Sequence, residues 1–336
     1  MPISIARRSF LAASAASALA ASLGAPLRAA DMVTLRMSTP ASETDQRSVA
    51  LAGVFAPAVA GFATYEPHYN GSLIAQGSEL ESIASGDLEM SITSAQELAT
   101  FFPEFSIFTA GYVHQDAYHQ VRVFNDPLMD PFKQKAEDEL GVKLLSVMYL
   151  GRRHVNLRFS RAERDVKTPA DLAGVNLRMP GSDAWQFLGR ALGANPTPMA
   201  FTEVYTALAT GSVDGQDNPL PTDKDAKFYE VTNQIVLTSH LVDLNYIAFS
   251  KAVWDGLSAD QQAVVQKAAD DAAESGRVKQ LALEEELVQF FKDQGLDVYE
   301  PDLAAFRSQV QAAYLGSDFA KAWPEGVLDQ INALGS

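Results

Sequence analysis

The chain has 336 residues, of which 47% are hydrophobic, and it contains no cysteine. This length is sufficient for two domains with sizeable cores. The absence of cysteine excludes disulfides, thiol catalysis, cysteine-based metal sites and a lipid-modified N-terminal cysteine. The formal net charge of −16 at pH 7 argues against nucleic acid and anionic lipid surfaces as partners, because both repel an acidic protein.

Residues 1–30 predict an export signal peptide that directs the mature chain to the periplasm as a soluble, unanchored protein. Arg7 and Arg8 precede a stretch rich in Ala, Ser and Leu, and two alanines stand immediately before Asp31. The paired arginines followed by Ser-Phe-Leu are typical of a twin-arginine signal. An ordinary secretory signal is the alternative, because Ala12 stands where a lysine is often found. The apolar part is too short and too rich in Ala and Ser to span a bilayer.

In the first part of the mature chain, strands and helices are expected to alternate. Apolar residues three and four apart predict helices, and short runs rich in β-branched and aromatic residues predict strands. The expected order is strand 33–39, helix 44–61, strand 63–71, helix 78–86 ending at Gly86, and strand 88–92. This alternation indicates a mostly parallel α/β sheet with crossover helices.

The second part repeats the alternation after a long apolar segment at residues 141–159. That segment is too long for one strand and is expected to carry the chain from the first domain into the second. The further expected elements are strands near 174–180, 212–218, 230–240 and 244–250, helices at 182–192 and 201–211, and one long helix from Ser258 to about Gly295. Trp185, Leu188 and Leu192 form a helical stripe that is interpreted as core.

This order of elements predicts two discontinuous domains behind the export signal. Domain I comprises residues 31–151 plus 244–283, and domain II comprises residues 152–243 plus 284–336. A helix as long as 258–295 can pack on both domains. Several ordered segments rather than one loose linker cross between them, which indicates a hinge.

Arg178 is the residue that carries the strongest chemical signal. It lies in the strand pattern "GVNLRMP", with its side chain on the opposite face from the apolar residues. Pro180 cannot continue a central strand, so Arg178 lies at the carboxyl end, where open α/β sheets bind ligands. A guanidinium there suits bidentate recognition of a carboxylate. The alternative is a structural ion pair with Asp183 or Asp171.

No pattern predicts catalysis, a cofactor or a metal. The sequence has no GxGxxG, GxxxxGK[ST], GxSxG or HExxH motif. His114 and His119 are five apart, so they would not share one helical face as zinc ligands, and they are interpreted as loop or surface histidines. The run "DGQDN", residues 214–218, lacks the ligand spacing of a calcium loop and is interpreted as a turn at the end of a strand.

Three stretches together resemble one family closely. "LGANPTPMAFTEVYTALATGSVDGQDNP" (192–219), with "TPADLAGVNLRMP" upstream and "KFYEVTNQIVLTSH" downstream, is similar to the substrate-binding proteins of tripartite ATP-independent periplasmic (TRAP) transporters, of the dicarboxylate-binding (DctP) type. The similarity can be followed from about Val33 to the C-terminus. It implies a periplasmic-binding-protein-like Venus flytrap, in which two α/β domains and a long domain-spanning helix enclose a central cleft.

The resemblance also implies the ligand-binding residues. Arg178 matches the family's arginine that pairs with the ligand carboxylate, Asn218 matches the asparagine of its "DGQ[ED]NP" motif, and Phe201 matches an aromatic residue beside the ligand. A second arginine matches either Arg153 or Arg158, because this chain is several residues longer than usual between that position and Arg178. Two residues of the first domain, at positions that usually face the cleft, complete the set: Gln76 and Ser94.

The implied function is high-affinity binding of a small organic acid in the periplasm and its delivery to the small and large membrane subunits of a TRAP transporter. The protein is expected to be a monomer and not an enzyme. Uronates, aldonates, short dicarboxylates, keto acids and aromatic acids all remain as ligands, and the polar cleft residues favour a hydroxylated one. The alternatives are a sensor subunit for a membrane histidine kinase and a periplasmic enzyme acting on an organic anion.

Overall fold

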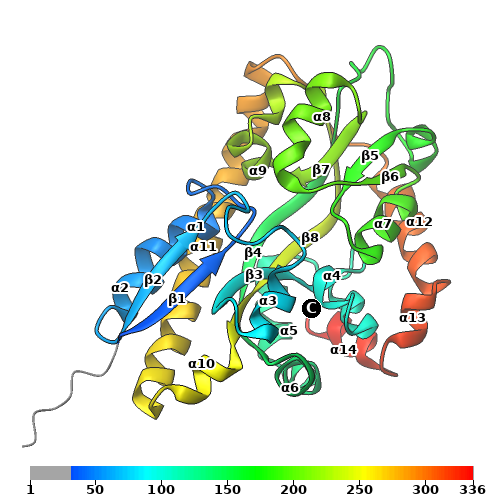
Figure 1. Cartoon of the computed structure of the whole chain (residues 1–336). Helices are drawn as coiled ribbons and strands as arrows, with labels where there is room; N and C mark the ends of the chain where they lie inside the picture. Colours follow the sequence, from blue (N-terminus) through cyan, green and yellow to red (C-terminus); the bar gives the residue numbers. More distant parts are fainter. Residues whose placement is uncertain (1–31, 336) are drawn as a thin grey trace, which may run out of the picture. The chain divides into compact units, whose positions relative to one another are not determined.

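The computed structural model describes residues 32–335, so the predicted export signal lies outside the described residues. Within this range, nine strands form one sheet in the order β2-β1-β3-β8-β4-β7-β5-β6, with β9 beside β8 (Figure 1). The strands are β1 (Val33–Ser38), β2 (Ala63–His68), β3 (Met90–Ser94), β4 (Val142–Leu157), β5 (Asn176–Met179), β6 (Asn195–Pro198), β7 (Gly215–Pro219), β8 (Gln234–Ser250) and β9 (Asp297–Tyr299).

Two long antiparallel strands, β4 and β8, join the two ends of this sheet. One end pairs β8 with β3, and the other pairs β4 with β7. We call the first end, with the elements packed on β1–β3, the first lobe, and the other, with those packed on β5–β7, the second lobe. The sheet is parallel within each lobe and antiparallel at the centre, because β8 returns alongside β4. The prediction of a mostly parallel sheet therefore holds only for the lobes.

The length of β4 differs from the prediction that 141–159 is too long for one strand. It is a single strand of 16 residues, and β8 is a single strand of 17 residues where two were expected. Three irregularities in the β4–β8 register explain how one strand can serve both lobes, since bulges bend and twist a strand locally. One lies at Gly151, whose φ of 130° suits glycine.

Helices cover the sheet on both faces. They are α1 (Gln46–Ala50), α2 (Ala56–Val59), α3 (Glu79–Ser85), α4 (Ala95–Leu98), α5 (Ala117–Asn125), α6 (Asp130–Leu140), α7 (Asp183–Ala191), α8 (Val204–Thr210), α9 (Leu220–Asp225), α10 (Lys251–Gly256), α11 (Ala259–Asp293), α12 (Leu303–Leu315), α13 (Asp318–Ala322) and α14 (Val327–Ala333). A π-helical segment, η1 (Leu51–Phe55), joins α1 to α2, so the helix expected at 44–61 is continuous but not uniform. The 3₁₀ segments include η2 (Pro103–Thr109) and η5 (Phe201–Glu203).

The long helix α11 confirms the prediction for residues 258–295. It begins with a capping box, in which the Ser258 hydroxyl and the Gln261 side chain satisfy free backbone N–H groups of the first turn. Along its 35 residues it packs on α1 and η1 of the first lobe and on α9 and β9 further along (Figure 1). None of the helices in residues 32–335 is long and apolar enough to cross a membrane.

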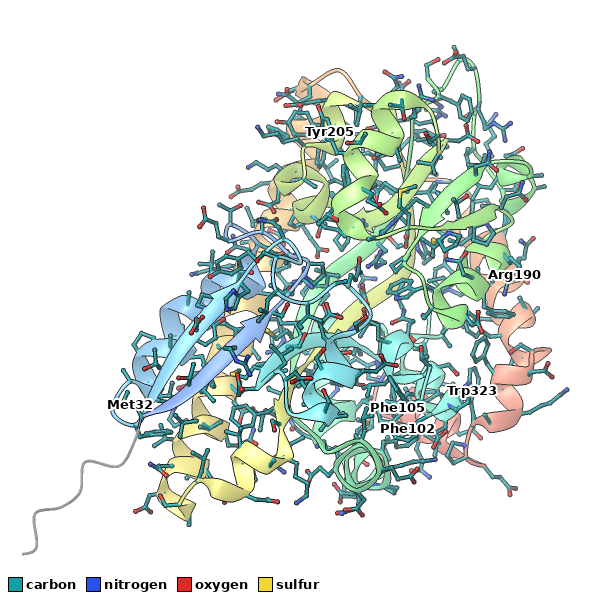
Figure 2. All side chains as sticks on the ribbon, in the orientation of Figure 1. Met32, Phe102, Phe105, Arg190, Tyr205 and Trp323 are labelled. Atoms are coloured by element: carbon teal, nitrogen blue, oxygen red, sulfur yellow. The ribbon has the colours of Figure 1, made fainter. Side chains whose placement is uncertain are left out.

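Aromatic packing fixes η2, the segment against which α13 packs. Phe105 makes an edge contact with Phe132, and their ring centroids are 5.4 Å apart. The indole Nε1 of Trp323 donates to the hydroxyl of Ser106 at 2.9 Å. Figure 2 labels Phe102, Phe105 and Trp323 in this region. The stripe of Trp185, Leu188 and Leu192 is buried as predicted.

Two interpretations of polar residues prove wrong. His119 is buried and belongs to α5, so it is neither a loop nor a surface histidine. His114 lies in the loop before α5, as expected, but it is buried there, with its ring centroid 5.1 Å from that of His119. The run "DGQDN" is not a turn, because Gly215–Pro219 is strand β7 and is buried at every position. Strand β7 lies between β4 and β5 and is covered on both faces. Its Asp, Gln and Asn residues are unusual for a buried strand, so the sequence did not indicate one.

Two of the predicted domain boundaries fall inside β4 and β8 at positions that face one another, since Gly151 pairs with Asp243, and the third, between residues 283 and 284, falls inside α11. Both strands continue through these positions without a break. The boundaries themselves stay a prediction.

Candidate ligand-binding site

A cavity between the first and second lobes collects most of the residues predicted to bind a ligand. Six of the seven line it: Gln76, Ser94, Arg153, Arg178, Phe201 and Asn218. They come from four strands, the loop before α3 and the first residue of η5, so only the folded sheet brings them together. We call this space the central cavity.

Arg178 lies at the end of β5 and is only 1% exposed. Its Nε and Nη2 donate to the backbone carbonyl of Met199 at 2.9 and 2.7 Å, which fixes the plane of the guanidinium. The ring of Phe201 lies beside it, with 6.0 Å between Cζ and the ring centroid. These contacts leave Nη1 without a hydrogen-bond acceptor among the described residues.

The charge of Arg178 has no direct counter-ion in residues 32–335. Asp171, one of the two carboxylates considered as its partner, instead accepts the backbone N–H groups of Lys167 and Thr168, and Asp183 forms no ion pair with Arg178. Burial lowers the pKa of Arg178 to about 9, and the carboxylates of Asp217 and Glu203 oppose this only in part. A buried cation in this state favours an anion beside it.

Arg153 also lines the central cavity, but its charge is balanced. Its Nε donates to Asp243 at 2.6 Å, and Nη1 lies 3.2 Å from Asp217. Although burial opposes its charge, these two carboxylates raise the pKa of Arg153 above its ordinary value. Its guanidinium stacks on Trp185, with Cζ 4.3 Å from the ring centroid. Trp185, predicted only as core, therefore also holds a cavity residue in place.

Arg158, the alternative second arginine, does not line the central cavity. It follows the last residue of β4, and its guanidinium packs against Gly211 at the end of α8. Of the two arginines left open by the sequence, the structure brings only Arg153 to the cavity.

Polar side chains around the cavity are oriented by their neighbours. The Asn218 amide donates to Gln216 Oε1 at 2.5 Å, and Gln216 in turn donates to Asp223 at 2.7 Å. This buried chain leaves the Asn218 carbonyl oxygen free to accept from a ligand. On the first lobe, Gln76 Oε1 accepts the backbone N–H of Phe201 at 2.7 Å, which links the two sides of the cavity.

Two charged residues of the cavity were not predicted, Arg47 and Glu97. Arg47 is held by Asp45 and donates through Nη1 to Asn245 Oδ1 at 2.7 Å. Glu97 belongs to the capping box of α4, where its Oε2 accepts the backbone N–H of Ser94 at 2.7 Å. The signature "SAQE" was visible in the sequence, but it predicts a helix start and does not show that the cap faces a cavity.

Comparison with known proteins agrees with this geometry. Residues 49–320 match the model of the DctP family, described as bacterial extracellular solute-binding protein, family 7. The chain belongs to this family. The resemblance drawn from the sequence is thus confirmed, and so is the two-domain Venus flytrap fold.

Among solved structures, a TRAP periplasmic solute-binding protein from Roseobacter denitrificans with bound 3-deoxy-D-manno-oct-2-ulosonic acid (KDO) is 79% identical. It superposes with a TM-score of 0.90, covering 91% of this chain and 100% of that one. A second protein from Roseobacter denitrificans, with bound L-galactonate, is 27% identical with a TM-score of 0.81 over 91% of this chain and 99% of that one. The sialic acid-binding periplasmic protein SiaP of Vibrio cholerae is 32% identical over 70% of this chain and 72% of its own length.

Proposed function

We propose that this family 7 protein is the periplasmic receptor of a TRAP transporter and that it binds a polyhydroxylated sugar acid of the ulosonic type, with KDO as the first candidate. The observation that carries this proposal is the buried guanidinium of Arg178, which faces the central cavity without a counter-ion in residues 32–335. The 79% identity to a KDO-bound relative supports the choice of acid.

The proposed binding step is physical and involves no catalysis. The ligand carboxylate would take charge-assisted hydrogen bonds from Arg178, while the Asn218 carbonyl would accept from a ligand hydroxyl. Arg153, balanced by Asp217 and Asp243, would contribute donors and shape rather than net charge. Because residues of both lobes line the cavity, a bound ligand would favour the closed arrangement, in which the lobes are in contact. The membrane subunits would then recognise this closed form.

Transport is favoured over the alternatives because the relatives are named as solute-binding proteins of transporters. A sensor or an enzyme receives no such support. The proposed partners are therefore the acid and the two TRAP membrane subunits.

The test is isothermal titration of the mature protein, after unfolding and refolding to remove carried ligand, with KDO, L-galactonate, sialic acid and succinate. We expect KDO to bind with the highest affinity and to raise the melting temperature by mass action. Arg178→Ala should weaken KDO binding by about a hundredfold or more, because it removes the charged partner of a buried carboxylate. Binding of none of these acids by the wild type would refute the proposal.

A further inference from the structure

The carboxylate of Glu97 uses only one of its oxygens within the protein. Oε2 accepts the backbone N–H of Ser94 at 2.7 Å and the hydroxyl of Thr93 at 3.1 Å. In residues 32–335 no group donates to Oε1, although Glu97 lines the same central cavity as Arg178. The cavity therefore contains an acceptor that the fold leaves unused.

Capping of α4 explains why an oxygen is needed at the position of Oε2, but it does not explain why residue 97 carries a carboxylate. A capping box works with Gln as well as with Glu at its third helical position. This chain shows as much at α11, where Gln261 closes the capping box with Ser258. A glutamate at residue 97 thus adds a feature that capping does not require, which is an acceptor-only end directed to the cavity.

No arginine of the cavity neutralises Glu97. Arg47 is engaged by Asp45, and Arg153 by Asp217 and Asp243. Arg178 donates to a backbone carbonyl instead. Among the described residues, then, the cavity offers one cation without a counter-ion, Arg178, and one carboxyl group without a cation, Glu97. Burial raises the pKa of Glu97, and the hydrogen bonds from Ser94 and Thr93, which favour the charged form, oppose that shift.

A carboxylate in this position discriminates between ligands. Hydrogen bonds from a hydroxyl to a charged acceptor are stronger than those between neutral groups. A second ligand carboxylate at the same place would meet like charge in a poorly solvated space. The two uncompensated groups therefore match a molecule with one carboxylate and several hydroxyls.

We propose that Glu97 determines the specificity of the site: its Oε1 accepts a hydrogen bond from a ligand hydroxyl, and its charge excludes dicarboxylates. This inference rests on the proposed function and narrows its substrate class to polyhydroxylated monocarboxylates. It assigns to the first lobe a selecting role, while Arg178 on the second lobe supplies the common carboxylate contact.

Glu97→Gln is the decisive variant, because glutamine keeps an oxygen for the cap and replaces the free acceptor with a donor. Asp171→Asn is the matched control, since Asp171 closes a second capping box, with Thr168, away from the central cavity. Both variants should keep the wild-type circular dichroism spectrum. KDO titrations should show roughly tenfold or greater weakening in Glu97→Gln, the worth of a hydrogen bond to a charged group, and no change in Asp171→Asn.

Competition with galactarate, which carries a carboxylate at each end, tests the exclusion. We expect it to leave KDO bound to the wild type. Unchanged KDO affinity in Glu97→Gln, or displacement of KDO from the wild type by galactarate at concentrations similar to those of KDO, would overturn the assignment while leaving the proposed function intact. Absence of binding of KDO, L-galactonate, sialic acid and succinate to the wild type would overturn both.

Discussion

The side chain of Gln76 accepts a hydrogen bond from the backbone N–H of Phe201 across the central cavity, between residues 125 positions apart. Gln76 belongs to the loop before α3, and Phe201 begins η5, so the bond joins the two lobes directly. Only proline would remove the backbone donor at residue 201, and it would also fix φ there, so Gln76 is the side to test.

Gln76→Ala should weaken KDO binding several-fold, because the backbone N–H of Phe201 loses its partner when the lobes meet, and one such bond contributes about 1 kcal/mol. Gln76→Glu should retain the acceptor and most of the affinity. Titration calorimetry on both variants distinguishes the loss of this bond from a general disturbance of the loop. Equal affinities in Gln76→Ala and the wild type would show that the bond plays no part in binding.

A second link between the lobes lies at Asp225, at the end of α9. Its carboxylate accepts the hydroxyls of Ser42, at 2.6 Å, and of Thr44. Asp225→Ala removes both bonds without touching the cavity, so we expect faster ligand dissociation in stopped-flow displacement and a smaller change in the association rate. Asp255→Ala, on the exposed surface of α10, is the control and should leave both rates as they are.

Arg153 and Arg178 should respond differently when their charge is removed. Arg153→Met leaves the buried carboxylates of Asp217 and Asp243 without their cation, which costs about 3 kcal/mol or more of folding free energy. Arg178→Met removes a cation that has no counter-ion, so urea unfolding of the ligand-free protein should show a much smaller loss. A larger loss in Arg178→Met than in Arg153→Met would contradict this division of roles.

Glu79 makes stability depend on pH. It is 5% exposed, and burial, aided by the charge of Glu97, raises its pKa from 4.5 to about 8. A carboxyl with a raised pKa holds its proton more tightly in the folded state, so the stability it contributes is complete below pH 4.5 and is lost as pH rises through about 8. Glu79→Gln should remove a slope of up to about 1.4 kcal/mol per pH unit in urea unfolding between these values.

Gly151 tolerates no side chain. A Cβ there would lie 2.5 Å from the Cβ of Pro219 and 2.7 Å from a carboxylate oxygen of Glu284, and the φ of 130° is unfavourable for other residues. Gly151→Ala should destabilise the protein by roughly 2 kcal/mol or more. Gly53→Ala provides the comparison, because the space around Gly53 is open. Similar melting temperatures for the two variants would argue against strain at Gly151.

The helices and the short strands could be predicted because their signals are local. The stripe ending at Leu192, the Gly86 stop of α3 and the Ser258 start of α11 each depend on a few neighbouring residues. The long strands could not, because bulges at positions such as Gly151 are set by partners about ninety residues away, in β8. For the same reason the interpretation of His119 was wrong, since its burial depends on the fold around it and not on its neighbours in sequence.

The site residues that lie in a family sequence pattern could be predicted. Those that only their position in the folded structure brings to the site could not. Arg178 and Asn218 lie in such patterns. Arg47 and Glu97 lie in helix-start sequences that occur at many surface helices, so only their position beside the central cavity distinguishes them. The choice between Arg153 and Arg158 likewise needed the register of β4.

The late position of β8 in the sequence affects how the protein folds during its synthesis on the ribosome. Strands β3 and β4 each pair with it, yet it comes more than seventy residues after β4 in the sequence. Until β8 has been synthesised, the edges of β3 and β4 that pair with it stay unpaired. Unpaired strand edges promote association with other chains. We therefore expect nascent chains that end before residue 234 to aggregate, and folding to be slow and to complete only after most of the chain has been made.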